Sequence, residues 1–431
     1  MLNSKFFRWT KLSKLNNSDI SFKRGLKNVS FISSANLISQ FIGFIGFIFI
    51  ARLFGPKNFG MYTTVMAFVT FFHLFLFGGL SKAVVREGSR KIESFDQVLE
   101  STSGMRILFI ILALFLCIGT TLFTNYSNTI KFLIIIFSSE IIYYGIDSFI
   151  NTTYQITEKM EYMAYFSVLT RLTVTAFSIA FLYLGSGVLG ILIVNLLCKF
   201  IILVIKFFHT RRIVKFNVSI NFDVKHPLLK ATVMFSLISF INTLAVKVDI
   251  LMISFLSTST DVGIYAIAHE ISKEGLMLRN AITTAFFPIA VKFLSKNSIK
   301  IKTLFTYALV LFLVVLAGCF LLSCFAQDVV VLLLGTKYDP SGHILSCLIF
   351  YLCFSFFSLP FTTYLQASHN EHLLIIVYTI TVLTNIPLNI ILFYKFGLLG
   401  IAYSTIIVFF VQCILVSFLT ARKMRTKKKS T

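Results

Sequence analysis

The feature that most constrains this chain is a series of hydrophobic runs, most of them about 20 residues long, that recur from one end to the other. A helix of that length crosses the hydrocarbon core of a bilayer. Only 13% of the residues are charged, whereas a soluble domain carries about a quarter. Because lipid accepts apolar side chains on the outside of a fold, the sequence predicts an all-helical integral membrane protein.

We divide the hydrophobic runs into about twelve transmembrane helices joined by short connections. The predicted spans are 28–50, 59–80, 105–124, 130–152, 162–184, 187–208, 231–256, 262–290, 302–323, 343–366, 371–393 and 399–420. An even number of spans places both termini on one side of the membrane. The longest connection on the opposite side, around 324–342, is close to an ordinary loop in length and leaves no room for a catalytic domain.

Positive charge is divided unevenly between the two sets of connections. The net charge is +22, and most Lys and Arg residues lie in the N-terminal tail, in every second connection and in the C-terminal run 422–429. Cationic connections stay on the cytoplasmic side, so we expect both termini there. Anionic membrane lipids account for this charge without a nucleic-acid partner.

The two halves of the sequence resemble each other. Gly60 and Tyr62 align with Gly263 and Tyr265, and further matches follow in the same order. These are Leu53 with Leu256, Thr152-Thr153-Tyr154 with Thr362-Thr363-Tyr364, Glu161 with Glu371, and Gly187 with Gly397. A duplicated six-helix unit gives two lobes related by a pseudo-two-fold axis along the membrane normal, with a site between them. Chance similarity between apolar helices is the alternative.

The duplication predicts a simple organisation of the chain. A basic tail at 1–27 precedes an N-terminal lobe at 28–208, and a linker at 209–230 leads to a C-terminal lobe at 231–420 and a basic tail at 421–431. We expect the tails and the linker on the cytoplasmic side.

Ionisable residues inside the spans are the candidate functional residues, because a charge deep in hydrocarbon costs at least a few kcal/mol and usually faces a cavity or a partner. A cavity for an anionic head group such as a diphosphate is expected to use Arg171, Lys199, Lys247, Lys273, Tyr144 and Asn151. Coupling protons or a coupling cation are expected at Glu140, Asp147, Asp249, Glu270 and Glu274. The alternative is that such residues only join helices, for example Lys273 neutralising Glu270 one turn away.

No motif in the sequence indicates enzymatic chemistry or a cofactor. Nucleotide-binding glycine loops, nucleophile elbows and zinc-protease motifs are missing, and the seven cysteines form no CxxC pair. His369 and His372 have a metal-like spacing, but no second ligand cluster accompanies them. We therefore expect neither an enzyme nor a bound cofactor or metal.

Several segments resemble a known family. They are the polar first span, "ARLFGP" from Ala51, "FGMY" from Phe59, Gly79-Leu80 and Val85-Arg86-Glu87 within residues 32–87, and "DVGIYAIAHEIS" at 261–272. This pattern resembles the bacterial oligosaccharide flippases of the polysaccharide-biosynthesis type, whose superfamily also contains multidrug and toxin extruders. The family usually has arginines at the positions of Arg52 and Arg86, and we expect gate or structural roles for both. Arg52, at the outer end of the first predicted span, is as readily a substrate ligand.

The resemblance implies two six-helix lobes around a central cavity. The implied substrate is an undecaprenyl-diphosphate-linked oligosaccharide, carried by alternating access from the cytoplasmic to the outer leaflet of the bacterial plasma membrane. A polymerase and a chain-length regulator of the same pathway are further expected partners. The family's lipid II flippases usually carry two more helices, which are missing here, and this favours O-antigen or capsular repeat units.

Two alternatives stay open at this point. A multidrug/cation antiporter of the same superfamily would need a pocket without the basic residues found here. A membrane polysaccharide polymerase would need a large external loop with catalytic residues, and no outer connection is long enough.

Overall fold

The structure is a computed structural model that describes residues 17–90, 95–213, 226–295, 301–368 and 370–430. Within these residues the regular elements are all helical. They are α1 (Asn17–Arg90), α2 (Phe95–Phe123), α3 (Asn128–Phe137), α4 (Glu140–Ile156), α5 (Met160–Tyr183), α6 (Val188–Ile213), α7 (His226–Leu256), α8 (Ser259–Ser295), α9 (Ile301–Leu334), the 3-10 helix η2 (Thr336–Tyr338), α10 (Asp339–Leu348), α11 (Tyr351–Ala367), α12 (Glu371–Phe396) and α13 (Leu398–Ser430).

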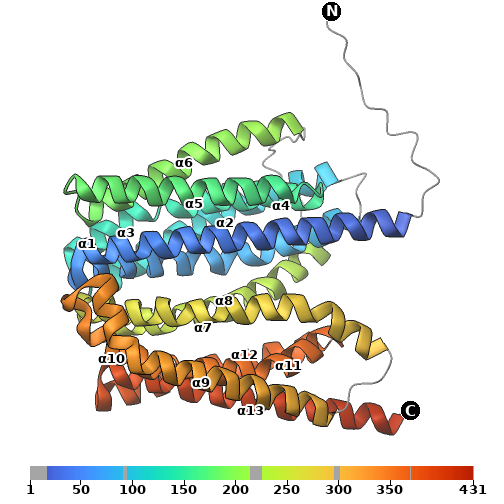
Figure 1. The fold of residues 1–431 in the computed structure, drawn as a ribbon. Helices are drawn as coiled ribbons and strands as arrows, with labels where there is room; N and C mark the ends of the chain where they lie inside the picture. The colour runs from blue at the N-terminus through green and yellow to red at the C-terminus, as the bar shows by residue number, and fades with distance from the viewer. Residues whose placement is uncertain (1–16, 91–94, 214–225, 296–300, 369, 431) are drawn as a thin grey trace, which may run out of the picture.

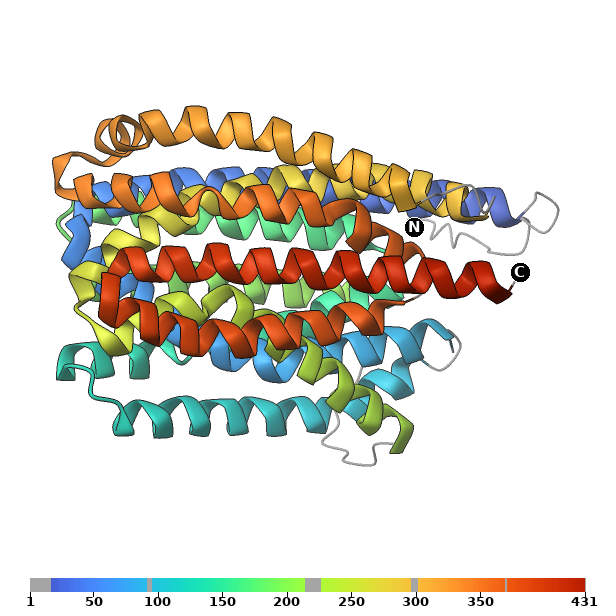
Figure 2. The same cartoon turned by 90° about the horizontal axis from the view of Figure 1, so that it is seen from below.

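The long helices lie side by side along one common direction (Figures 1 and 2). In Figure 1 the helices α1–α6 occupy the upper part of the bundle and α7–α13 the lower part; we call these groups the N-terminal and C-terminal halves. Helix α1 begins and α13 ends at the right of the view, which we call the terminal end. The opposite end, where α10 lies, is called the distal end.

Nine of the helices or helix pairs in the described residues are long and apolar enough to cross a membrane, so the protein is an all-helical, multi-pass membrane protein. Helix α1 holds the first two predicted spans and contributes one of the nine. The seventh and eighth predicted spans lie in α7 and α8, which are outside the nine. Charged residues such as Glu270, Lys273 and Glu274 interrupt the apolar sequence of α8.

A glycine divides α1 into two spans. Gly55 has φ 71° and ψ 169°, a non-helical conformation in the left-handed half of φ space that glycine adopts at no steric cost. Pro56 follows, and a residue before proline favours the extended ψ found here. The chain therefore turns back at the distal end and returns beside its first segment (Figure 1).

Both halves contain a helix that is broken at an equivalent place. The fourth predicted span consists of α3, with 10 residues, and α4, with 17 residues. The tenth consists of α10 and α11, with the same two lengths. The repeated break is a structural counterpart of the sequence similarity between the halves.

Several helices extend beyond the hydrophobic runs. Helix α9 continues to Leu334 and α10 begins at Asp339, so the prediction of a connection over 324–342 is wrong for most of its length. Helix α13 continues to Ser430, through the predicted tail. Hydropathy does not detect such turns, because a helix satisfies its own backbone hydrogen bonds and continues past the lipid into water. Residues 1–16 and 214–225 lie outside the described residues.

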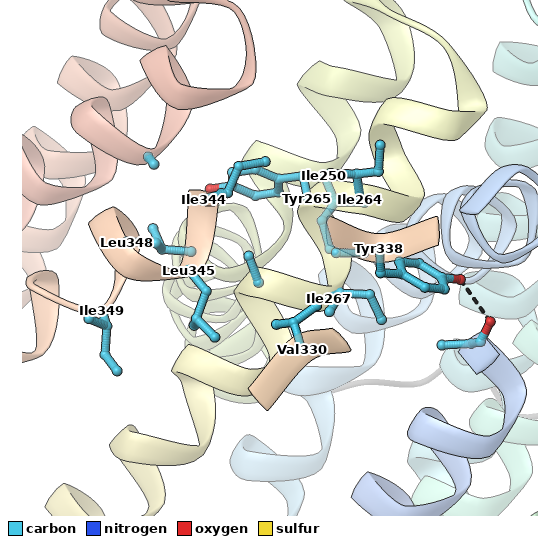
Figure 3. Close-up of a cluster of buried hydrophobic side chains, with 14 of the residues drawn as sticks. Ile250, Ile264, Tyr265, Ile267, Val330, Tyr338, Ile344, Leu345, Leu348 and Ile349 are labelled. Carbon is cyan, nitrogen blue, oxygen red and sulfur yellow. Dashed lines mark hydrogen bonds between the residues drawn. The ribbon is translucent and has the colours of Figure 1, made fainter. Parts of the chain in front are cut away.

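The largest buried cluster lies at the distal end, where the two halves meet. It combines Phe59 of α1 with Tyr265 and Ile267 of α8, Tyr338 of η2 and Ile344 of α10. Figure 3 shows the contribution of α8, η2 and α10 to this cluster. Large apolar side chains on the outer surface of helices such as α9 are exposed instead, which suits a surface surrounded by lipid.

Candidate functional site

Two ion pairs link α4 to α6 in the N-terminal half. Lys199 Nζ donates to Glu140 Oε1, and Lys206 Nζ lies 2.6 Å from Asp147 Oδ1. Both pairs join residues 59 positions apart, as expected for two helices that run in the same direction. The side chains of Glu140 and Lys206 are only 7% and 5% exposed. Helix α6 therefore provides one lysine for each of the two acidic residues of α4.

Aromatic rings complete the surroundings of Lys199. Its ammonium nitrogen lies 5.7 Å from the ring centroid of Phe137 and 5.8 Å from that of Tyr143. Both distances are in the range of cation–π attraction. Lys199 is thus held by a carboxylate and by two aromatic rings.

Asn151 and Tyr144 lie on the same helix, in different surroundings. Asn151 donates to Asp147 Oδ2 at 2.8 Å and accepts from Lys206 Nζ at 2.7 Å, so it closes a three-residue network. Tyr144 is half-buried and packs against the apolar cluster of the N-terminal half. Of these two predicted cavity residues, Asn151 belongs to the ion-pair network.

Arg171 lies on α5 and reaches across α1. Its guanidinium occupies the space beside Gly43, where an added Cβ would come within 2.0 Å of Nη2. Thr175 packs against Gly46 in the same way. These glycines allow a charged side chain to pass between two closely packed helices. Arg171 remains exposed, and its charge acts on Glu274 of α8, in the other half.

Charged residues of α7 and α8 form a second group. Lys273 Nζ donates to Glu270 Oε2 at 2.7 Å, one turn apart on α8. Lys247 of α7 lies within electrostatic range of both residues, and it has no ion-pair partner in the part of the chain that the structure describes. Glu274 lies within range of Lys273 and of Arg171. Arg171 of the N-terminal half and Lys273 of the C-terminal half thus both lie within electrostatic range of Glu274.

Asp249 is a buried carboxylate surrounded by neutral donors. Its side chain accepts hydrogen bonds from Asn389 at 2.8 Å, from Thr405 at 2.9 Å and from Tyr265 at 3.2 Å. These donors come from α12, α13 and α8, and Asp249 itself lies on α7 with a 7% exposed surface. Asn389 Oδ1 is also buried and has no hydrogen-bond partner among the described residues. Such a group of oxygen atoms can accept a proton or a small cation.

The two arginines implied by the family pattern lie away from these groups. Arg52 lies in α1 shortly before the turn at Gly55, and its side chain is exposed at the distal end. Arg86 lies in the last turns of α1, and its side chain is outside the described part. Neither position contradicts a gate or structural role.

Two arginines inside the spans were given no role by the sequence analysis, the buried Arg106 and the partly buried Arg279. Arg106 of α2 donates to Thr152 Oγ1 at 3.2 Å, and Arg279 of α8 donates to Thr362 Oγ1 at 3.4 Å. Thr152 and Thr362 are aligned positions of the repeat, although their arginines come from different helices. The repeated threonines mark the two equivalent positions in the sequence, but the sequence does not show which arginine donates a hydrogen bond to each.

Residues 25–294, more than half of the chain, match the polysaccharide biosynthesis protein family. The chain belongs to that family. Among curated proteins, none matches the chain. The polysaccharide biosynthesis protein family thus provides the assignment by sequence.

Solved structures share the fold of this polysaccharide biosynthesis protein. The lipid II flippase MurJ, in an inward closed conformation, has a TM-score of 0.75 at 19% identity, over 90% of this chain and 87% of that chain. An inward-facing multidrug resistance MATE family transporter of the MOP superfamily has a TM-score of 0.68 at 16% identity, over 91% and 96%. A MOP superfamily transporter from Pyrococcus furiosus, described by a reverse polarity of its binding pocket, has a TM-score of 0.62 at 17% identity, over 93% and 96%.

At these identities the structural similarity shows the fold alone. Together with the family match, it makes this chain a polysaccharide biosynthesis protein whose fold is that of the MurJ flippase and the MATE transporter.

Proposed function

We propose that the protein carries a polyprenyl-diphosphate-linked oligosaccharide, an O-antigen or capsular repeat unit, from the cytoplasmic to the outer leaflet of the bacterial plasma membrane. The observation that carries this proposal is the proximity of cations from both halves, with Arg171 on one side and Lys247 and Lys273 on the other. The lipid II flippase, a carrier of a lipid-linked substrate, has the same fold and supports it.

The cations suit an anionic head group for a physical reason. A diphosphate loses hydration when it leaves water, and fixed cations replace that hydration. The attraction between two charges 4 Å apart rises from about 1 kcal/mol in water to about 4 kcal/mol at an effective dielectric constant of 20. Arg171 is the best-placed residue, because its planar guanidinium binds phosphate oxygens in pairs and no acid in the described residues forms an ion pair with it.

Lys199, the remaining basic residue of the predicted cavity, has a different role. Lys199 is bonded to Glu140 and flanked by two rings, so it shapes the N-terminal half and adds little net charge. The residues Glu140, Asp147 and Glu270 are likewise engaged by lysines. Binding of the substrate is therefore assigned first to Arg171, Lys247 and Lys273.

The two halves act as lobes that rock against each other. We assign α1–α6 and α7–α13 to two six-helix lobes related by a pseudo-two-fold axis along the membrane normal, which makes twelve spans because α1 contains two. The repeated break in α3–α4 and α10–α11 supports this assignment. The basic segments favour a cytoplasmic location for both termini, and we therefore assign the terminal end to the inner side and the distal end to the outer side. The lipid tail stays in the bilayer while the head group passes between the lobes.

Asp249 is the best candidate for the coupling ion. The other predicted acids are paired with lysines or lie beside them, whereas Asp249 has only neutral donors and is joined to three further helices of its lobe. Protonation or cation binding at this carboxylate would change the packing of α7, α8, α12 and α13 together. Ion binding can thereby bias the position of the lobe.

The same carboxylate favours a second candidate function, that of a multidrug/cation antiporter. Such a transporter has the same fold and also uses an ion gradient, so Asp249 fits both functions. The cations between the halves favour the lipid-linked anion, because they would repel a cationic drug.

A deletion strain that lacks related transporters tests the proposal. We expect lipid-linked repeat units to accumulate in the inner leaflet and surface polysaccharide to disappear, with unchanged susceptibility to cationic drugs. Restoration by the intact gene and not by an Arg171→Glu variant would tie the phenotype to the cationic group. Normal surface polysaccharide together with increased drug susceptibility would support the antiporter instead.

A further inference from the structure

Two tyrosines connect the halves at the distal end, each from the segment that precedes a short helix. Tyr126 comes just before α3, and its hydroxyl lies 2.5 Å from Ser254 Oγ of α7. Tyr338 comes just before α10 and donates to the Ala51 carbonyl of α1 at 2.8 Å, the bond drawn as a dashed line in Figure 3. Each hydroxyl therefore reaches from one half of the protein to the other.

The two contacts are related by the internal repeat. Helices α3 and α10 occupy equivalent places in the halves, and the tyrosines precede them. Their acceptors are equivalent too: Ala51 lies nine residues before Gly60, and Ser254 lies nine residues before Gly263. The two contacts are thus pseudo-two-fold counterparts, although Tyr126 lies two residues before α3 and Tyr338 one residue before α10, and one acceptor is a hydroxyl while the other is a backbone carbonyl. A random packing contact would have no such counterpart.

Both tyrosines act as hydrogen-bond donors. Ser254 Oγ already donates to the Leu251 carbonyl at 2.7 Å, so its remaining role toward Tyr126 is to accept. The acceptor of Tyr338 is a backbone carbonyl, which cannot donate. Replacement of either tyrosine by phenylalanine therefore removes one donor and keeps the ring. The Tyr126 ring remains stacked on Phe255, with centroids 5.1 Å apart.

A cavity of about 250 Å³ lies beside the first contact. Hydroxyl and amide side chains from both halves line it, including Thr64, Asn125, Ser127 and Thr258. Water that enters this cavity competes for the Tyr126–Ser254 hydrogen bond as the halves separate. The polar lining allows water to reach this part of the junction, which favours separation of the halves there.

We propose that Tyr126 and Tyr338 form a symmetry-related pair of latches that close the distal gate between the halves, and that both must open during transport. The proposal rests on the proposed rocking of the two lobes and adds the residues that hold its outward gate shut. Each latch contributes one hydrogen bond, so loss of one hydroxyl should raise the open fraction roughly twofold to tenfold. Loss of both should multiply the two effects, because the sites share no partner.

Alkylation of a single buried cysteine measures this opening directly. Thr64 lines the cavity and is 1% exposed, so a water-soluble maleimide reacts with Thr64→Cys only when the gate opens. The rate is measured on the purified full chain in liposomes without substrate, after replacement of the seven native cysteines. The alkylation rate is proportional to the fraction of molecules whose gate is open, even when that fraction is small. A change in the open fraction is therefore detected whatever its starting value.

We expect Tyr126→Phe and Tyr338→Phe each to increase the alkylation rate at Thr64→Cys about twofold to tenfold, and the double variant to show the product. Ser254→Ala should increase the alkylation rate as much as Tyr126→Phe does, and the variant with both changes should react no faster than either single variant. Ser254→Ala combined with Tyr338→Phe should instead show the product of the two increases. Tyr183→Phe is the matched control, because Tyr183 is 69% exposed at the same end and has no hydrogen bond among the described residues.

A second reporter separates gate opening from general loosening. Cys117 is fully buried inside the N-terminal half, and its alkylation rate, measured with Cys117 as the sole cysteine, should not change. An unchanged rate at Thr64→Cys in the double variant, or an equal increase at Cys117 or in Tyr183→Phe, overturns the latch proposal. The substrate assignment is tested separately: a normal deletion strain with the expected alkylation rates would refute the flippase and leave the latches standing.

Discussion

Gly60 and Gly263 face each other across the two halves, and neither has room for a side chain. A Cβ on Gly60 would lie 1.6 Å from the Ser259 carbonyl oxygen, and a Cβ on Gly263 would lie 2.0 Å from the Pro56 carbonyl oxygen. Each glycine thus meets the residue four positions before the other glycine. Such a reciprocal contact is typical of a two-fold axis, on which equivalent residues meet. The internal repeat of the sequence aligns the same two glycines with each other.

Substitution of these glycines should disturb the junction of the halves. Gly60→Ala places a methyl group against backbone that cannot move aside, and overpacking of this kind costs about 1–3 kcal/mol. We expect a lower melting temperature and a loss of export. Gly119→Ala is the control, because a Cβ there meets nothing within 4 Å. An unchanged melting temperature and full export in Gly60→Ala would contradict the contact.

The ion pair between Lys199 and Glu140 should act mainly on stability. Lys199→Met leaves a buried carboxylate unpaired, which typically costs about 3–5 kcal/mol, whereas removal of both charges is tolerated far better. We expect low abundance and a lowered melting temperature for Lys199→Met, and recovery in Glu140→Gln with Lys199→Met. Lys57→Met, at an exposed lysine without an ion pair in the described residues, is the control. If the double variant is as unstable as the single one, the pair is not what stabilises this region.

Arg171 should act mainly on transport. It has no ion-pair partner in the described part of the chain, so its loss leaves no acid buried and unpaired. We expect Arg171→Ala to reduce export of lipid-linked repeat units at least about tenfold at normal abundance, with a greater loss for Arg171→Glu and a smaller one for Arg171→Lys, because lysine keeps the charge but not the paired donors. Arg212→Ala, at the exposed end of α6, should export normally. Full export by Arg171→Glu would end the assignment of this residue to the substrate.

Asp249 should determine the response to ion gradients. Asp249→Asn keeps the size of the side chain and removes its ability to bind a proton or cation. Transport in liposomes should then lose its dependence on a proton or sodium gradient, while Thr405→Val, which removes one of three donors, should weaken that dependence only in part. A gradient response in Asp249→Asn equal to that of the unchanged protein would assign coupling to another acid.

The orientation in the membrane can be measured with reporter fusions. The charge distribution predicts that a reporter after residue 429 lies in the cytoplasm and that one fused near residue 337 lies outside. A cytoplasmic signal from both fusions would be incompatible with twelve spans and with an outward distal end.

The lengths and order of the spans could be predicted closely, and the contacts of the site only in part. Each of the twelve predicted runs matches part of a described helix or helix pair to within one residue at its ends, because apolar length is a local property. The pairing of Lys206 with Asp147 and Asn151 was not recognised, although Glu140 and Asp147 are spaced as Lys199 and Lys206 are. That spacing becomes informative only once α4 and α6 are known to lie side by side.

The sequence by itself determined that the chain must reside in lipid and that it is helical, and it predicted a duplication, since composition, apolar run length and repeated motifs are properties of the chain alone. Only the tertiary structure decided which charges are neutralised and which remain available. Lys199 and Arg171 looked alike as cations within spans, but α4 presents the Glu140 carboxylate to Lys199, whereas Arg171 packs beside Gly43 of α1 and has no ion-pair partner among the described residues. The energy of a charge in a membrane depends on its nearest neighbours, and those come from helices distant in the chain.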